Sequence, residues 1–275
     1  MRLFTIEDLA KVTEDCCTKS TDDAFAALES LQHFQIIGSG DDRFAIRVGS
    51  VPIVAVCHLD TVLGNTSWHC DTKTNVVTSS ELDDRLGLAC LLLLATIHDF
   101  TIVCCDHEEV GRSTADVAAD YIQEHGIPCN WIFELDRRGV DVVSYDYSEP
   151  LWDGILANYF GEIGQGSFSD VCRMESLGVK AFNAGIGYHR EHTMHCHANL
   201  NDTLERCHQV VAMVEDLANV RLPHDSQMTP GYRDFAGTFE DLEECQSCQQ
   251  LEECDQYDGM ILCDDCWLTF RDAVQ

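Results

Sequence analysis

Histidine and carboxylate side chains recur between residues 58 and 192, where predicted strands end or a predicted helix begins. These residue types bind divalent transition ions in proteins. The candidates are His58, Asp60, Asp83, Asp84, Glu108, Glu109, Asp136 and His192. In an open α/β sheet, ligands bind outside the carboxyl ends of the strands, so we expect these side chains to meet in one crevice.

The residue types fit a hydrolytic site that holds two zinc ions. Two ions roughly 4 Å apart need nitrogen and carboxylate ligands, with one carboxylate shared between them. Such ions lower the pKa of a bound water and polarise the carbonyl group that the water attacks. A further carboxylate must pass the water's proton to the leaving amine, and another must orient a histidine. The candidates supply all of these groups.

Strand and helix signals alternate along most of the chain. Apolar runs predict strands over 34–37, 43–48, 52–57, 75–78, 101–105, 129–135, 140–145 and 180–186. Helical periodicity predicts helices over 5–17, 21–33, 83–99, 114–125, 151–159, 169–176 and 200–220. Residues 61–74 carry neither pattern and are expected to form a loop. The alternation predicts an α/β fold with a mostly parallel central sheet and helices on both faces.

The order of these motifs resembles the clan of co-catalytic zinc peptidases. That clan includes the aminoacylase and carboxypeptidase G-like enzymes and the dinuclear zinc aminopeptidases. His-Leu-Asp-Thr-Val at 58–62, then Trp68 and Asp-Asp-Arg-Leu-Gly at 83–87, is similar to the aminoacylase type. Glu-Glu-Val-Gly at 108–111 is closer to the aminopeptidase version. The resemblance covers roughly residues 1–220.

The resemblance implies a zinc exopeptidase-like fold and a set of ligands. His58, Asp83 and Asp136 would hold one zinc ion. Asp83, Glu109 and His192 would hold the other, so that Asp83 bridges the two ions. The inserted dimerisation domain of many relatives is missing, because the intervals between the motifs are too short to contain it.

The resemblance also implies a general base and a positioning carboxylate. Glu108 would act as the base and acid, and Asp60 would hydrogen-bond His58. The chain departs from the family at Cys196, because relatives often carry a glutamate four residues after the last histidine. Four histidines remain open as that last ligand: His189, His192, His195 and His197.

Each candidate also has an ordinary structural interpretation. Asp83 could cap the following helix, because an aspartate at a helix start satisfies free N–H groups. Glu108 and Glu109 could form a solvated acidic pair. Asp136 could form a surface ion pair with Arg137. The histidine run could be a non-specific metal-binding tract. The joint pattern, with the motifs in order on one α/β chain, favours the metal site.

The composition excludes several classes of function. The 275 residues are 45% hydrophobic, enough for one substantial core and one small unit. Lys and Arg number 17 against 48 Asp and Glu, and the formal charge of −31 would repel nucleic acids and anionic membranes. No apolar run reaches the roughly 18 residues of a membrane span. Residues 1–20 are acidic and lack a secretory pattern, so we predict a cytoplasmic protein.

A second metal site is predicted near the C-terminus. Cys245-Gln-Ser-Cys248 and Cys263-Asp-Asp-Cys266 have the Cys-x2-Cys spacing of one structural zinc ion, with Cys254 as a spare thiol. The segment resembles a zinc-ribbon or treble-clef finger, and so small a unit would fold mainly on its metal. Disulfides are the alternative in an oxidising compartment. The predicted boundaries are 1–220 for a hydrolase domain, 221–240 for a linker and 241–275 for the cysteine unit.

The leading hypothesis is a two-zinc metallohydrolase that cleaves a terminal amide bond of a small peptide or an N-acyl amino acid. Co²⁺ or Mn²⁺ could replace zinc in the catalytic site, because sequence does not fix the metal. The alternative is an inactive relative that serves as an interaction module, binding a protein partner or a second copy through its cysteine unit. Glu108 favours the enzyme, because a decayed site often loses its base first.

Overall fold

The computed structural model describes residues 4–31 and 33–225 and, nearer the C-terminus, four short strands. The chain forms two compact units, Met1–Thr229 and Pro230–Gln275. In the second unit the strands pair antiparallel, β12 with β13 and β14 with β15. Their bounds are β12 Glu243–Glu244, β13 Leu251–Glu252, β14 Cys254–Tyr257 and β15 Met260–Cys263. The predicted domain boundaries stay a prediction.

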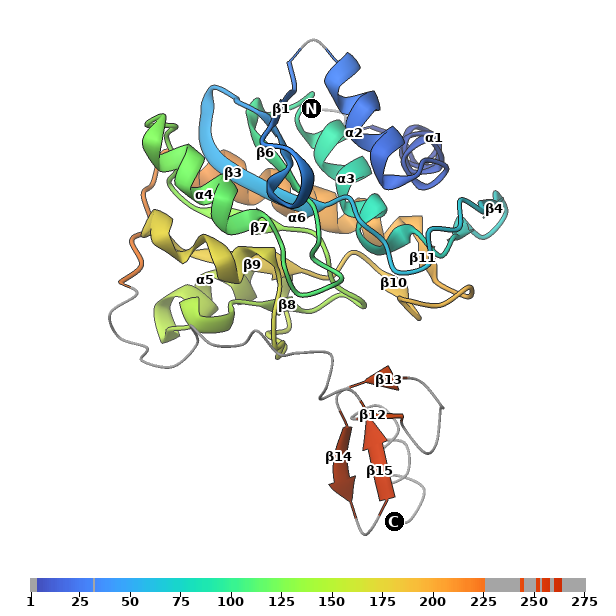
Figure 1. The fold of residues 1–275 in the computed structure, drawn as a ribbon. Helices are drawn as coiled ribbons and strands as arrows, with labels where there is room; N and C mark the ends of the chain where they lie inside the picture. Colours follow the sequence, from blue (N-terminus) through green and yellow to red (C-terminus); the bar gives the residue numbers. More distant parts are fainter. Residues whose placement is uncertain are drawn as a thin grey trace. The chain divides into compact units, whose positions relative to one another are not determined.

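The larger unit is built on a sheet whose four central strands run parallel (Figure 1). The strands pair in the order β1 (Gln35–Ile37), β2 (Phe44–Arg47), β6 (Phe100–Cys105), β3 (Val51–His58), β7 (Ile132–Glu134), β9 (Ala181–Ala184) and β8 (Val142–Val143). The outer strands β1, β2 and β8 pair antiparallel. The predicted α/β class with a largely parallel central sheet is therefore confirmed.

A second, antiparallel sheet lies beside the first and was only partly predicted. Its strands pair in the order β10 (Tyr188–His189), β11 (His197–Asn199), β5 (Val76–Thr78) and β4 (His69–Asp71). The expectation of a loop over 61–74 was wrong at β4. Its three residues, His-Cys-Asp, are too few and too polar to give an alternating pattern.

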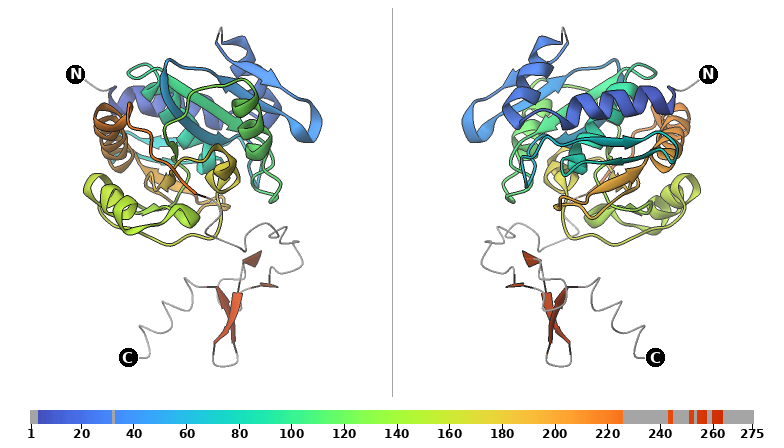
Figure 2. Two further views of the ribbon diagram at one scale, coloured as in Figure 1. Left: turned by 90° about the vertical axis from the view of Figure 1, so that its left-hand side faces the viewer. Right: turned by 90° about the vertical axis from the view of Figure 1, so that its right-hand side faces the viewer.

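Helices cover both faces of the central sheet (Figure 2). On one face α3 (Leu82–Leu94) packs on β3, and α1 (Ile6–Cys17) and α6 (Leu200–Leu217) pack on α3. On the other face lie α4 (Ala115–Glu124) and the 3-10 helix η3 (Asp170–Leu177). The remaining helices lie nearer the sheet edges: α2 (Thr21–Ser30), η1 (Gly40–Asp42), η2 (Tyr145–Tyr147) and α5 (Pro150–Phe160).

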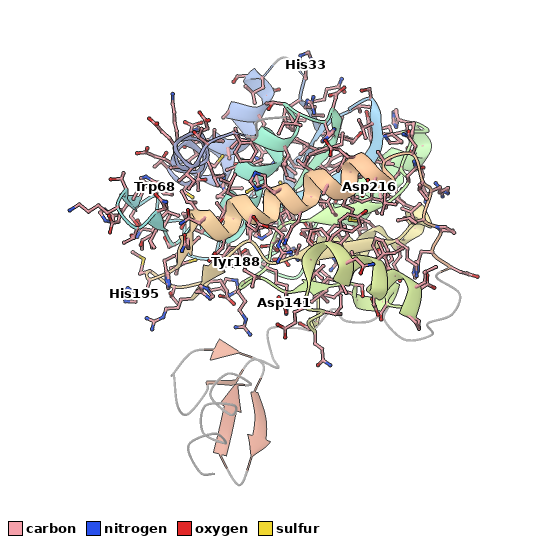
Figure 3. All side chains as sticks on the ribbon, turned by 180° about the vertical axis from the view of Figure 1, so that it is seen from behind. His33, Trp68, Asp141, Tyr188, His195 and Asp216 are labelled. Atoms are coloured by element: carbon pink, nitrogen blue, oxygen red, sulfur yellow. The ribbon has the colours of Figure 1, made fainter. Side chains whose placement is uncertain are left out.

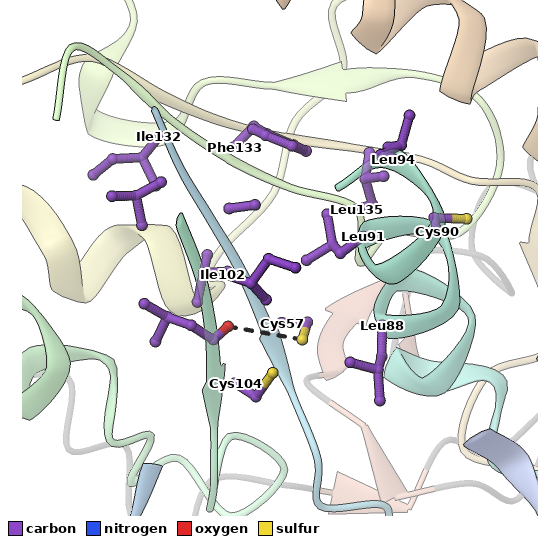
Figure 4. Close-up of a cluster of buried hydrophobic side chains, with 14 of the residues drawn as sticks. Cys57, Leu88, Cys90, Leu91, Leu94, Ile102, Cys104, Ile132, Phe133 and Leu135 are labelled. Atoms are coloured by element: carbon purple, nitrogen blue, oxygen red, sulfur yellow. Dashed lines mark hydrogen bonds between the residues drawn. The ribbon is translucent and has the colours of Figure 1, made fainter. Parts of the chain in front are cut away.

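The core between sheet and helices is apolar, and several cysteines form part of it. Figure 4 shows Cys57, Cys90 and Cys104 among leucine, isoleucine and phenylalanine side chains. Burial raises the pKa of the Cys57 thiol well above its ordinary value. Such a thiol stays protonated and packs as a small hydrophobic group. The central strands are thereby held rigidly, which fixes the positions of the residues at their carboxyl ends.

The start of α3 depends on the absence of a side chain at Gly87. The Gly87 N–H donates to Oδ1 of Asp84 over 3.1 Å, so Asp84 caps the helix. A Cβ at position 87 would lie 2.0 Å from that oxygen and 2.5 Å from the carbonyl oxygen of Leu135. Only glycine therefore allows the helix start to approach the end of β7 this closely.

Replacing Gly87 with alanine is expected to destabilise the protein by about 1–3 kcal/mol, because the helix start or the backbone at Leu135 must shift. Urea denaturation would measure the change. Gly154→Ala in α5 is the control, since a Cβ there meets nothing within 4 Å. This control should be neutral or gain up to about 1 kcal/mol. Equal stability of both variants would contradict the packing argument.

Candidate metal centre

The candidate residues come from five places in the larger unit. His58 ends β3, and Asp60 follows it; Glu108 and Glu109 follow β6. Asp136 follows β7, Asp83 lies at the start of α3, and His192 lies in the loop between β10 and β11. Because β3, β6 and β7 are parallel neighbours, their carboxyl ends meet at one edge of the sheet. The structure brings all of these side chains together there.

Two groups of possible ligands share Asp83. In the first, Nε2 of His58 lies 3.2 Å from Oδ1 of Asp83 and 3.6 Å from Oδ2 of Asp136. In the second, Nε2 of His192 lies 3.1 Å from Oδ2 of Asp83 and 3.1 Å from Oε2 of Glu109. Within each group the ligand atoms lie within 4.8 Å of one another. Asp83 thus turns one carboxylate oxygen to each group.

The spacing of these atoms fits a metal ion in each group. Tetrahedral zinc with ligands at about 2.0–2.1 Å separates neighbouring ligand atoms by about 3.3 Å. The observed separations of 3.1–3.6 Å lie close to that value. Oε1 of Glu109 is buried without a hydrogen-bond partner among the described residues, as expected of an oxygen that a cation would contact. Each group therefore fits a metal ion, and Asp83 is common to both.

Asp83 is free for this arrangement because its neighbour caps the helix. The backbone of Asp83 is not helical, with ψ at 111°, and the cap belongs to Asp84. The interpretation of Asp83 as the helix cap was therefore wrong by one residue.

Asp60 connects the two strand ends that carry His58 and the glutamate pair. Its carboxylate accepts hydrogen bonds from the N–H groups of Glu108 and Glu109 over 3.1 and 3.0 Å. Its main-chain carbonyl lies 3.0 Å from Nδ1 of His58, and its Oδ1 lies 3.5 Å from the same nitrogen. Since a carbonyl can only accept, Nδ1 carries a proton, and Nε2 is the nitrogen that faces Asp83 and Asp136 and would be left for a metal ion.

Tyr188 is a residue that the sequence analysis missed. Figure 3 labels Tyr188. Its buried hydroxyl donates to Oδ1 of Asp136 over 2.7 Å, while Oδ2 of that aspartate faces His58. The Asp136 N–H also donates to Oδ1 of Asn183 over 2.9 Å. The first contact orients the Asp136 carboxylate, and the second holds its main chain. A tyrosine just after an apolar run resembles an ordinary core residue, so no local signal pointed to it.

In the metal-free centre, the pKa values of several side chains are strongly shifted. Burial would lower the pKa of His58 and of His192, but the surrounding carboxylates outweigh it; the pKa of His58 lies well above its usual value and that of His192 is about 11. Burial and the neighbouring Asp83 raise the pKa of Asp136 to about 7. Burial would raise the pKa of Asp83, but hydrogen bonds from His192 and His58 lower it. In the absence of ions, two imidazolium groups thus balance the carboxylates.

Glu108 lies beside the ligand groups without belonging to either. Its Oε2 lies 3.9 Å from Nε2 of His58. Burial, opposed by His58 and helped by Asp136, raises the pKa of Glu108 well above its ordinary value. A carboxyl group whose pKa is raised in this way can accept a proton and release it again.

Two further buried acids lie behind the centre. Glu134 in β7 accepts a hydrogen bond from the Ser169 hydroxyl, and Asp170 accepts one from Ser113. Burial and the Asp170 charge raise the pKa of Glu134 well above its usual value. Neither acid belongs to the two ligand groups found among the described residues.

The other histidines of the His-rich stretch lie elsewhere. His189 and His197 pair across β10 and β11, and His195 is exposed in the loop between them. Within residues 4–31 and 33–225, neither ligand group includes any of these three. Of the four alternatives, His192 is the one that reaches Asp83 and Glu109.

The predicted cysteine site lies almost entirely outside the described residues. Cys245, Cys248 and Cys266 are not described. Cys263 lies in β15, where its backbone pairs with that of Cys254 in β14. The zinc finger therefore stays a prediction.

No protein-family model matches the chain, and no curated protein matches its sequence. Solved structures match its fold. The aminopeptidase PepT from Bacillus cereus superposes with a TM-score of 0.60 at 12% identity, over 78% of this chain and 99% of the other. A tripeptidase from Staphylococcus aureus gives 0.58 at 10% identity, over 79% and 100%. The TET1 peptidase of Pyrococcus horikoshii gives 0.57 at 14% identity, over 76% and 98%. The chain thus shares the fold of these peptidases.

No helix among the described residues is long and apolar enough to cross a bilayer.

Tyr188→Phe is expected to weaken zinc binding about 10–100-fold, because the variant loses the hydrogen bond that orients Asp136. Competition with a chromophoric chelator would measure the affinity. Tyr159→Phe is the matched control, since it removes a hydroxyl that donates to Asp216 on the surface over 2.8 Å. If both variants bind zinc equally well, Tyr188 does not position a ligand.

The metal-free protein is expected to lose stability as pH rises from 6 to 8. The folded-state pKa values of His58 and His192 lie above their unfolded values. Their stabilising contribution is therefore complete below about pH 6.5 and is lost as pH rises. Asp136, with a folded pKa of about 7, acts in the same direction from about pH 4 upward, because its burial disfavours ionisation.

Urea midpoints of chelator-treated protein at pH 6 and pH 8, followed by the fluorescence of the buried Trp131 and Trp152, would measure this loss. Zinc-loaded protein is the control. Zinc should raise the midpoint more at pH 8, because metal binding competes with protons for its ligands. A metal-free midpoint that rises with pH would show that the charge balance is different.

Proposed function

We propose that the chain is a two-zinc metallopeptidase that cleaves a terminal amide bond of a small peptide. One observation carries this proposal: Asp83 lies between two sets of histidine and carboxylate ligands, with the free carboxyl group of Glu108 beside them. In a structural zinc site, four protein ligands complete the coordination of the ion. Three protein ligands on each ion would instead leave a fourth position open for water or substrate. The fold shared with an aminopeptidase and a tripeptidase supports the same conclusion.

The proposed ligands are divided between the two groups. His58, Asp83 and Asp136 hold one ion, and Asp83, Glu109 and His192 hold the other. Ions held by these residues would supply activation of a bound water and polarisation of the scissile carbonyl group, and Co²⁺ or Mn²⁺ would supply the same chemistry as Zn²⁺. The oxygen and nitrogen ligands suit all three metals. The metal content of the purified protein would show which of them is bound.

Glu108 is the proposed general base and acid. It takes a proton from the attacking water and delivers that proton to the nitrogen of the leaving amine. Its raised pKa suits this shuttle, because the same carboxyl group must hold the proton and then release it. Asp60 positions Glu108 through the main-chain N–H, over 3.1 Å, and thereby couples the base to the loop that orients His58.

The proposal also includes the domain boundaries and a role for the cysteine unit. Residues 1–220 form the hydrolase domain, 221–240 the linker and 241–275 a unit in which Cys245, Cys248, Cys263 and Cys266 hold a third, structural zinc. This unit serves as a docking or self-association module. TET1 of Pyrococcus horikoshii is described as assembling into a tetrahedron or a large octahedral shell, which makes self-association of this chain worth testing.

Assays of the same purified protein would also test two other functions, an inactive interaction module and a deacylase. An inactive relative that acts only as an interaction module would have no need of a half-buried acid beside the ligands, and Glu108 is such an acid. Cleavage of an N-acyl amino acid uses the same chemistry at the same centre. A screen that contains dipeptides, tripeptides and acyl amino acids therefore separates the peptidase from a deacylase.

Glu108→Gln is expected to lower kcat about 10²–10⁴-fold and to leave zinc content unchanged, because the side chain moves protons and does not bind the ions. Hydrolysis of unblocked dipeptides and tripeptides, with zinc measured on the same desalted samples, would test this.

Glu124→Gln, on the exposed surface of α4, is the matched control for the loss of one negative charge. Full turnover in Glu108→Gln would refute the assigned base. Absence of zinc and of hydrolysis in the unaltered protein would refute the proposed function as a whole.

A further inference from the structure

The His-rich hairpin carries a second cluster of possible ligands outside the centre already described. Strands β10 and β11 pair antiparallel, and His189 lies directly opposite His197. The centroids of the two imidazole rings are 5.7 Å apart. Directly opposite residues on antiparallel strands point to the same face of a sheet. The two rings therefore stand side by side on one face of the hairpin.

That face is the outer one. Tyr188 and Ala198 form the neighbouring pair of the same ladder, and both are buried. Successive side chains along a strand alternate between the two faces. Accordingly His189 is exposed and His197 is half-buried, on the side opposite to Tyr188. Figure 3 labels Tyr188 within the unit and His195 at its periphery.

The orientation of one ring is already fixed for metal binding. Nδ1 of His197 lies 3.0 Å from the main-chain carbonyl oxygen of His195. Because the carbonyl oxygen can only accept, Nδ1 carries the proton and Nε2 keeps its lone pair. Histidines that bind metals usually make this contact with their second nitrogen, which fixes the tautomer and raises the basicity of the ligand.

We propose that His189 and His197 bind a divalent transition ion at the surface, separate from the dinuclear centre. Two imidazole nitrogens with water in the remaining positions suit Zn²⁺, Ni²⁺ and Cu²⁺. The formal charge of −31 favours accumulation of cations near the surface. This site needs no ligand from either of the two groups around Asp83.

An ion bound by His189 and His197 would also affect the loop between their two strands. The two strands flank the loop 190–196, which contains His192. Arg190 and His192 both have left-handed backbone, with φ at 59° and 58°, so this loop turns sharply. An ion that joins His189 to His197 would hold together the two strands from which that loop extends. The effect on His192 rests on the proposed function, whereas binding of the ion does not.

Titration with Ni²⁺ would test the site on the full, zinc-loaded and desalted chain. The unaltered protein is expected to bind one more Ni²⁺ per chain than His189→Gln or His197→Gln, or to bind it at least tenfold more tightly. Ions taken up by the dinuclear centre or by cysteines are common to all these proteins and cancel in the comparison. His69→Gln is the matched control, because His69 lies in the same cross-strand row but is separated from His197 by Thr78.

A second measurement does not depend on the variants. Ni²⁺ added to the unaltered protein should broaden the imidazole resonances of His189 and His197 before those of His69. Equal stoichiometry and affinity in all four proteins, or broadening that begins elsewhere, would overturn the proposal. Loss of peptide hydrolysis is not needed for either result, so failure of the proposed function and failure of this site are distinguishable.

Discussion

The larger unit depends on a balance of charge around the shared carboxylate of Asp83. Buried carboxylates close together repel one another and lose their hydration, so positive charge must compensate them. In the chain alone, His58 and His192 supply that charge, and each contacts a different oxygen of Asp83. The same two imidazoles present the nitrogens that we propose as metal ligands. Metal binding would therefore exchange two protons for two divalent ions at the same position, which explains why so many acids can remain together there.

The rest of the centre is organised by uncharged hydrogen-bonding groups. Main-chain N–H groups hold Asp60, the Tyr188 hydroxyl holds Asp136, and a main-chain carbonyl fixes the ring of His58. None of these groups carries a charge. They therefore restrict the orientation of the side chains without altering the balance of charge around Asp83. Their positions follow from the parallel strands, whose buried apolar residues leave little freedom of movement. The apolar core and the polar centre are thus parts of one arrangement.

Much of this could be predicted from the sequence, for identifiable reasons. His58, Glu108 and Asp136 follow apolar runs that could be recognised as strands, and parallel strands bring their ends together. The role of Asp84 as the helix cap could not be predicted, because two adjacent aspartates look equivalent until the backbone dihedral angles are known. Tyr188 could not be recognised either, since its contact with Asp136 joins distant segments. Strand β4 is too short and too polar to give a periodic signal.

The four histidines of the hairpin look equivalent in the sequence, but the register of the two strands gives them different positions. Pairing of Tyr188 with Ala198 requires His189 to lie opposite His197, on the outer face. The alternation that turns the Tyr188 hydroxyl inward to Asp136 therefore turns His189 outward. Among the described histidines of this hairpin, His192 in the intervening loop is the one that reaches Asp83. One strand pairing thus sets the positioning tyrosine, the loop histidine and the outer pair together, and a shift of one residue would displace all of them.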